Sequence, residues 1–178
     1  MQTVQLLQVT DPHLFGDPAT ELYGVNTAES LRLTLAAALA DGPVPDAVLV
    51  TGDIGDDMSA AAYANFKRAL AGCGAPVFCL PGNHDDPALM TQLLNGDGFQ
   101  YCGSARLGGW GLVLLDTHVP GRPHGRLAAG ELERLDAELR ALHGVALQHL
   151  AVAVADQRIL RRGGRAGYPF RHDNRRPA

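Results

Sequence analysis

Short apolar runs alternate along the chain with longer segments in which apolar residues recur at helical spacing. Runs of strand length, rich in Val and Leu, occupy residues 4–10, 46–51, 76–80, 111–115 and 146–154. Segments with a helical period, several of them beginning at Asn, Ser or Asp, occupy residues 26–40, 59–72, 86–94 and 128–143. Strands that alternate with helices predict βαβ units with a mostly parallel sheet and flanking helices, so the expected fold class is α/β.

Polar residues of one chemical kind follow the first three predicted strands. The first strand ends at Asp11-Pro12-His13, the second at Gly52-Asp53, and the third at Gly82-Asn83-His84-Asp85. The carboxyl ends of parallel strands line one crevice of an α/β sheet, and ligands bind there. We therefore expect the three clusters to converge in space, although they are far apart in the sequence.

The chemistry of these clusters favours metal ions. Carboxylates, imidazoles and an amide oxygen form a donor set that suits Mn, Fe or Zn. In an extended chain Asp11 and His13 point to the same side and can reach one ion, while glycines at 52 and 82 leave room for the backbone to turn. Two metal ions about 3.5–4 Å apart, bridged by a carboxylate, activate water and clamp a phosphoryl group. They also neutralise phosphate charge, which reconciles an anionic substrate with a net charge of −4.

The charge is divided unevenly along the chain. Residues 1–155 hold 8 basic and 17 acidic residues, whereas residues 156–178 hold 7 Arg and 2 Asp. The acidic body lacks the basic footprint of a nucleic-acid-binding protein, so we do not expect nucleic acid as a partner. No run of about 18 apolar residues predicts a membrane span. With neither a signal-peptide pattern nor a cysteine motif, we expect a cytoplasmic protein.

The three clusters together resemble the calcineurin-like metallophosphoesterases, whose pattern is Asp-x-His, then Gly-Asp, then Gly-Asn-His-Asp/Glu. Within that family the surroundings are similar to the bacterial 3′,5′-cyclic-AMP phosphodiesterases, the class III cyclic-nucleotide phosphodiesterases. The resemblance covers about residues 3–150 and is carried by the stretches QVTDPHLFGD (8–17), LYGVNTAESL (22–31), VTGDIGDDMSAAAYANF (50–66), LPGNHDDPALM (80–90) and LLDTHVPGRPHGRL (114–127).

The resemblance implies a role for each residue of the clusters. Two divalent ions are implied, Fe or Mn with Zn as the alternative, and their ligands are Asp11, His13, Asp53 and Asn83, with Asp53 bridging. His84 is implied to contact the phosphate without binding a metal, and Asp85 to orient His84. The implied reaction opens a cyclic nucleotide, cAMP, to its 5′-monophosphate.

The family pattern continues beyond what this chain contains. A later strand of the family ends in a His that binds metal, and a Gly-His-x-His follows; this chain has no Gly-His-x-His, and residues 155–158 read Ala-Asp-Gln-Arg. His118 and His124 lie near a predicted strand end but carry no ligand pattern. We therefore expect an N-terminal metallophosphoesterase part at 1–155 with an incomplete metal site, and a partial sandwich whose second sheet is largely missing. Residues 156–178 are expected to form an Arg-rich tail, either a frameshift product or a natural variant.

Three functions stay open from the sequence. The first is a phosphodiesterase for 3′,5′-cyclic nucleotides, impaired by the incomplete site. The others are a phosphoesterase of broader specificity and a catalytically inactive fragment. Because a sheet that is meant to be covered on both faces exposes apolar surface when half of a sandwich is absent, self-association is also expected.

Overall fold

The computed structural model describes residues 3–40, 42–143 and 149–154. The predicted tail at 156–178 lies outside the described residues. At the centre is a parallel sheet with the strand order β1-β4-β5-β6, which confirms the α/β class and the mostly parallel arrangement. Its strands are β1 (Leu6–Val9), β4 (Ala47–Thr51), β5 (Val77–Leu80) and β6 (Phe99–Tyr101).

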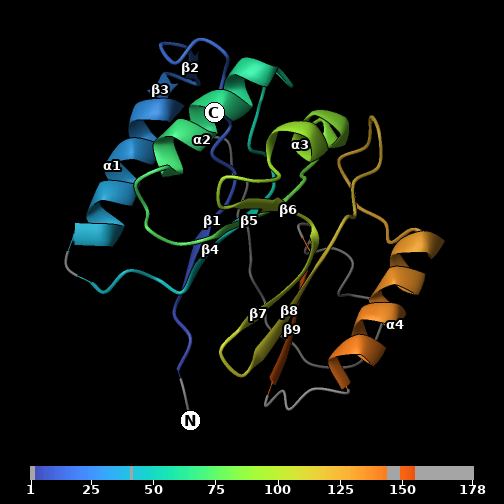
Figure 1. Ribbon diagram of the computed structural model, residues 1–178. Helices are drawn as coiled ribbons and strands as arrows, with labels where there is room; N and C mark the ends of the chain where they lie inside the picture. Colours follow the sequence, from blue (N-terminus) through green and yellow to red (C-terminus); the bar gives the residue numbers. More distant parts are fainter. Residues whose placement is uncertain (1–2, 41, 144–148, 155–178) are drawn as a thin grey trace, which may run out of the picture.

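Three helices cover one face of this sheet (Figure 1): α1 (Thr27–Ala40), α2 (Ala60–Leu70) and α3 (Pro87–Leu93). The first turns of α2 and α3 are both capped by side chains, and the cap of α2 at Ser59 is the one that the sequence predicts. The Ser59 side chain accepts from the N–H of Ala62, and the Asp86 carboxylate accepts from the N–H groups of Ala88 and Leu89. A short hairpin, β2 (Glu21–Leu22) with β3 (Val25–Asn26), leads directly into α1.

A second, smaller sheet lies against the other face of the first. It contains β7 (Gly103–Leu107), β8 (Trp110–Leu115) and β9 (His149–Val154), with β7 antiparallel and β9 parallel to β8. The helix α4 (Ala129–His143) connects β8 to β9 and lies outside this sheet in Figure 1. The last two predicted strands therefore belong to the second sheet, of which the described residues supply three strands.

The chain crosses between the two sheets at a sharp bend that the sequence analysis missed. β6 and β7 are separated by one residue, Cys102, which has a φ of 49°, and Gly103 follows with a φ of 89°. Both values lie in the left-handed region, where the chain reverses within a residue or two. β6 and β7 are short and polar in part, so neither shows the apolar run that identified the other strands.

Alternation along the strands divides the core into layers. On β4, Val48 and Val50 pack under the helices, whereas Ala47 joins a cluster between the sheets with Leu112 and Leu114 of β8. The opposite face of β8 packs on Leu127 and on Leu135 of α4. The result is a helix–sheet–sheet–helix order in which both faces of the parallel sheet are covered.

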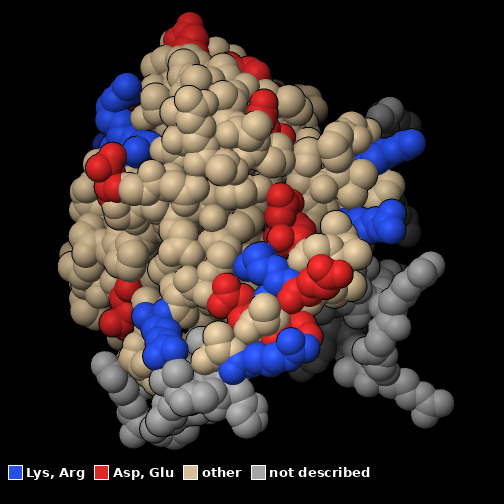
Figure 2. Space-filling view, turned by 45° about the vertical axis from the view of Figure 1, so that its right-hand side comes forward, with Lys and Arg blue, Asp and Glu red and all other residues tan. Residues whose placement is uncertain are grey.

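Most charged side chains lie on the surface of these layers, and Asp85 is the buried exception among the described residues. On the face that Figure 2 shows, acidic and basic side chains are intermingled, and along α4 they pair as Glu131 with Arg134 and Asp136 with Arg140. Among the described residues, no helix combines the length and the apolar character that crossing a bilayer requires.

The layer between the sheets predicts a stability effect. Leu114→Ala removes a fully buried side chain from β8 and leaves a cavity, so the free energy of unfolding should fall by about 2–5 kcal/mol. Urea unfolding followed by circular dichroism measures it. Leu132→Ala on α4 is the matched control, because Leu132 is 50% exposed, and its effect should stay within about 0.5 kcal/mol. Equal losses for the two variants would contradict this packing.

Candidate metal centre

The loops after β1 and β4 run side by side and hold the first two clusters together. Beyond the paired strands, the N–H of Asp11 donates to the carbonyl of Gly52 at 3.1 Å, and the N–H of His13 donates to the carbonyl of Asp53 at 2.9 Å. The pairing continues the parallel ladder past its last regular residue. Asp11, His13 and Asp53 are thus set in register by backbone hydrogen bonds, as the expected convergence requires.

The backbone at these three residues is not extended. Asp11, His13 and Asp53 have φ values of 53°, 44° and 50°, all in the left-handed region. The expectation that Asp11 and His13 face the same side through extended alternation is therefore wrong. Their side chains converge because each residue turns sharply. Left-handed conformations in residues other than glycine cost of order 1 kcal/mol or more and occur disproportionately at functional sites.

The side chains of the two loops and of His84 surround one point. The Nε2 atom of His13 lies 3.9 Å from Asp11 Oδ1 and 3.8 Å from Asp53 Oδ2. Potential ligand atoms of His13, Asp53 and His84 all lie within 4.8 Å of one another. Two ligand atoms on one ion are about 3–3.5 Å apart at ordinary metal–ligand distances, so small side-chain rotations close the gap. The donors present therefore fit a divalent metal ion.

Gly82 brings the third cluster against the second. A Cβ atom at this position would overlap Asp53 Oδ1 and the Asp53 backbone nitrogen, so no larger residue fits. The close approach lets the N–H of His84 donate to Asp53 Oδ1 at 2.9 Å. Asn83 lies between them in sequence and lines the same pocket as Asp11 and Asp53.

Asp85 performs a different task from the one expected. Its carboxylate is 1% exposed and accepts from the backbone N–H groups of Ile54, Gly55 and Gly82 at 2.9–3.1 Å. Burial raises its pKa, and these backbone hydrogen bonds oppose the rise. The expected pairing of Asp85 with His84 is thus wrong, because both carboxylate oxygens join the loop after β4 to the loop after β5.

Tyr63 of α2 completes this buried network. Its hydroxyl donates to Asp85 Oδ1 at 3.2 Å and accepts from the N–H of Asp86 at 2.8 Å. Burial raises the pKa of Tyr63, and the nearby Asp85 carboxylate adds to the effect, so the phenol stays a protonated donor. α2 therefore contributes to the site through Asp85 without reaching the pocket.

The residue that does orient His84 is Asp56, which the sequence analysis missed. Asp56 Oδ1 lies 3.2 Å from Nδ1 of His84 and 2.9 Å from Nδ1 of His13. A carboxylate at Nδ1 fixes the ring and leaves the Nε2 lone pair for a ligand or a proton. The signal available was its spacing, three residues after Asp53 in the same loop.

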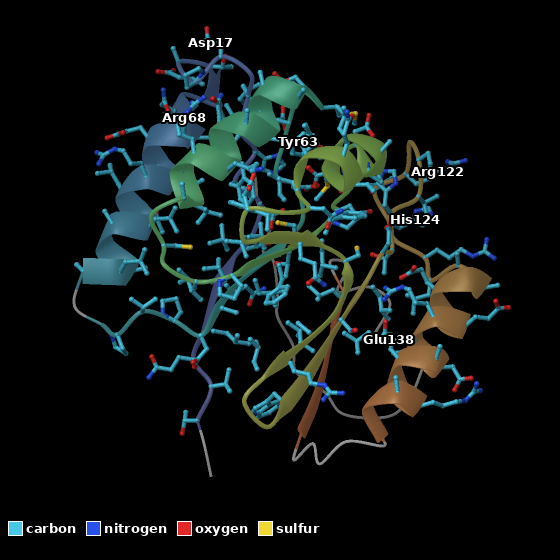
Figure 3. The ribbon with its side chains drawn as sticks, in the orientation of Figure 1. Asp17, Tyr63, Arg68, Arg122, His124 and Glu138 are labelled. Carbon is cyan, nitrogen blue, oxygen red and sulfur yellow. The ribbon has the colours of Figure 1, made fainter. Side chains whose placement is uncertain are left out.

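The pocket beside these residues has a volume of about 130 Å³ and two walls. Asp11, Asp53 and Asn83 line one wall, on loops of the parallel sheet. Residues 117–125, after β8 of the second sheet, form the other wall; we call them the opposing segment. It carries His118, Arg122 and His124, and Figure 3 shows the last two on the loop between β8 and α4. His118 and His124 thus reach the site region, and Arg122 is a cation that the sequence analysis did not single out.

The contact at Gly82 generates a prediction. Gly82→Ala places a methyl group on Asp53 and forces the loops apart, so the affinity for Mn²⁺ should fall at least about tenfold and the stability by about 1–3 kcal/mol. A titration with Mn²⁺ and urea unfolding measure the two effects. Gly72→Ala is the control, because nothing lies within 4 Å of a Cβ there. Unchanged Mn²⁺ affinity in Gly82→Ala would argue against the close approach.

Comparisons with known proteins show which proteins this chain is similar to. Curated relatives include the "3′,5′-cyclic adenosine monophosphate phosphodiesterase CpdA" proteins of Haemophilus influenzae and Escherichia coli K12. Each is 39% identical over 137 residues, which are 76% of this chain and 50% of the relative. The "3′,5′-cyclic-nucleotide phosphodiesterase alr5338" of Nostoc is 32% identical over 155 residues, 85% of this chain and 58% of that protein. The chain thus spans about half the length of the curated relatives that it matches.

A solved structure and a family profile complete the comparison. The crystal structure of TT1561 from Thermus thermophilus matches 80% of this chain and 63% of its own, with a TM-score of 0.53 and 18% identity, which is a likeness of fold alone. The profile of the calcineurin-like phosphoesterases matches residues 4–146, the part that contains every residue of the candidate centre. The chain belongs to the calcineurin-like phosphoesterase family.

Proposed function

We propose that this chain is a metal-dependent phosphodiesterase that hydrolyses 3′,5′-cyclic nucleotides, cAMP first, to 5′-monophosphates. One observation carries the proposal: Asp11, His13, Asp53, Asn83 and His84, from three separate loops, gather at the carboxyl edge of one parallel sheet beside a pocket. The relatives described above are named as cyclic-nucleotide phosphodiesterases, which supports the substrate class.

The cofactor that we propose is a pair of divalent ions, Fe or Mn with Zn as the alternative. Asp11 and His13 would hold one ion, Asn83 would hold the other, and Asp53 would bridge the two. When bound, the ions neutralise the phosphate charge and lower the pKa of a coordinated water. A carboxylate, an imidazole and an amide oxygen suit these metals, and the convergence of their side chains supports the assignment.

His84 and Asp56 have complementary roles in this proposal. The side chain of His84 is 44% exposed, so it can contact the phosphate or the departing oxygen. Asp56 Oδ1 lies 3.2 Å from Nδ1 of His84, which orients the ring and directs Nε2 away from the carboxylate. The imidazole is thus placed as a hydrogen-bond donor or a proton donor to the oxygen that leaves phosphorus.

Two other functions remain as alternatives. The metal residues only build a phosphate clamp, so a phosphoesterase of broader specificity has the same centre. A catalytically inactive fragment is the third candidate, because Asp11, His13, Asp53 and Asn83 alone leave the coordination of two ions incomplete. The cytoplasm is the location that we propose, and the free, buried thiols of Cys73, Cys79 and Cys102 support a reducing compartment.

Hydrolysis assays on the full chain separate the three functions. With added Mn²⁺, we expect cAMP to be cleaved to 5′-AMP with a higher kcat/KM than bis-p-nitrophenyl phosphate, and Asp53→Ala to reduce that rate at least about 100-fold. Liquid chromatography of the products measures it. Leu132→Ala serves as a surface control. Preference for bis-p-nitrophenyl phosphate would favour the broader enzyme, whereas no cleavage of either compound, with much less than two ions bound per chain, would favour the inactive fragment.

Self-association is a separate proposal about partners. Both faces of the parallel sheet are covered, but among the described strands β1 lies at its edge, with Leu6 46% exposed. Beside this edge, Leu7, Val9 and Leu31 line a groove of about 360 Å³ between β1 and α1. An exposed strand edge with apolar side chains favours strand pairing between copies.

This proposal predicts a molar mass that depends on concentration. Light scattering coupled to gel filtration should show species larger than one chain as the concentration rises. Leu6→Lys should shift the population toward the monomer, because a charge on an edge strand opposes pairing. Val44→Lys, which also changes an exposed apolar residue, is the control. A monodisperse monomer across the concentration range would contradict the proposal.

A further inference from the structure

The opposing segment, residues 117–125, is closed into a loop at its base. The N–H of Arg126 donates to the carbonyl of Thr117 at 2.7 Å, which brings the two ends of the segment together. Thr117 is 2% exposed, whereas Arg122 and His124 near the tip are exposed. The tip faces solvent and the pocket, and its position therefore depends on the contacts that hold the base of the segment.

The carboxylate of Asp116 holds that base with both oxygens. Asp116 Oδ1 accepts from the N–H of His118 at 2.7 Å, and Oδ2 accepts from the hydroxyl of Tyr101 on β6 at 2.7 Å. Burial raises the pKa of Tyr101, so its phenol remains a donor to the carboxylate. Asp116 thus connects the opposing segment to the last strand of the parallel sheet.

Side chains of α4 also hold the base of the opposing segment. The N–H of Asp116 donates to Glu131 Oε2 at 3.0 Å. Arg134 binds the same carboxylate at 2.7 Å and also donates to the carbonyl of Leu114 at 2.6 Å. The base of the opposing segment is therefore tied to β6, β8 and α4, by groups that do not themselves line the pocket.

The two walls of the pocket share one design. The wall that Asp11, Asp53 and Asn83 line is called the metal wall. Behind it, Tyr63 donates to the buried Asp85, which fixes the loops that carry Asp53 and Asn83. On the opposing wall, Tyr101 donates to Asp116, which fixes the loop that carries His118. The networks belong to different loops, so one can be weakened while the other stays intact.

We propose that Asp116, held by Tyr101, is a positioning residue for substrate that sets the opposing wall independently of the metal centre. The inference rests on the proposed function for its substrate, a cyclic nucleotide. The phosphate lies at the metal wall, so the part of the nucleotide beyond the phosphate contacts the opposing segment. An interaction of that kind is made equally in the ground state and the transition state, and its loss raises KM while leaving kcat unchanged.

Tyr101→Phe tests the proposal on the full chain, because it keeps the ring and removes one hydrogen bond. With Mn²⁺ present, KM for cAMP should rise about tenfold while kcat stays within about twofold, as expected for the loss of uniform binding. Amide hydrogen exchange in residues 117–126 should accelerate about tenfold, in line with the loss of one partly buried hydrogen bond. The Kd for Mn²⁺ alone should stay within about twofold of the unaltered chain.

Tyr63→Phe is the matched control, since it removes the equivalent hydroxyl from the metal wall. It should weaken Mn²⁺ binding and leave exchange in residues 117–126 unchanged. Asp116→Ala supplies a second variant on the opposing wall, because it removes both accepting oxygens, and its KM for cAMP should rise at least as much as that of Tyr101→Phe.

The outcomes separate this inference from the proposed function. Absence of cAMP hydrolysis by the unaltered chain would overturn the function, and the exchange rates of residues 117–126 would still decide whether Tyr101 positions the segment. Unchanged exchange in Tyr101→Phe, or a fall in kcat and Mn²⁺ affinity with KM unchanged, would overturn the inference.

Discussion

The buried carboxylate of Asp85 is the contact on which the candidate centre depends. It accepts hydrogen bonds from the loop after β4 and from the loop after β5, and it receives the hydroxyl of Tyr63 from α2. A buried carboxylate is costly unless its oxygens are satisfied, so the three elements must meet for any of them to be stable there. The positions of Asp53 and Asn83 relative to each other follow from this meeting. The hydrogen bonds that the buried Asp85 needs for stability thus also set the geometry of the candidate site.

The remaining loop is fixed in a different manner. The loop after β1 extends the parallel ladder beside the loop after β4, and backbone hydrogen bonds to its neighbour offset the cost of left-handed turns at Asp11, His13 and Asp53. Asp56 then bonds to both imidazoles, one from each side of the centre. Carboxylates therefore have three roles in this site. Asp11 and Asp53 line the pocket, Asp56 contacts the imidazole rings, and Asp85 accepts from backbone N–H groups.

The sequence predicted the order of most strands and helices, the cap at Ser59, and the convergence of three loops. These features depend on local periodicity and on the rule that parallel strands end at one edge, both of which can be read without coordinates. It did not predict β6 and β7, because their identity depends on pairing partners more than on apolar runs. It also missed Asp56 and assigned Asp85 to the wrong partner. The spacing of Asp56 from Asp53 marks it as a neighbour of the site, but spacing alone does not tell whether a carboxylate turns toward a ring, as Asp56 does, or into the core, as Asp85 does.

The division of the core into layers has a consequence for the pocket. One wall stands on loops of the parallel sheet and the other on a loop of the second sheet, so the width of the pocket depends on how closely the two sheets pack. That spacing is set by side chains such as Ala47 and Leu112, which lie between the sheets and carry no polar atom. Packed sheets are about 10 Å apart, and the exact value depends on the volumes that fill the gap. A change in the size of these core residues would therefore change the width of the pocket, and with it the ligands that fit, although the residues themselves do not line the pocket.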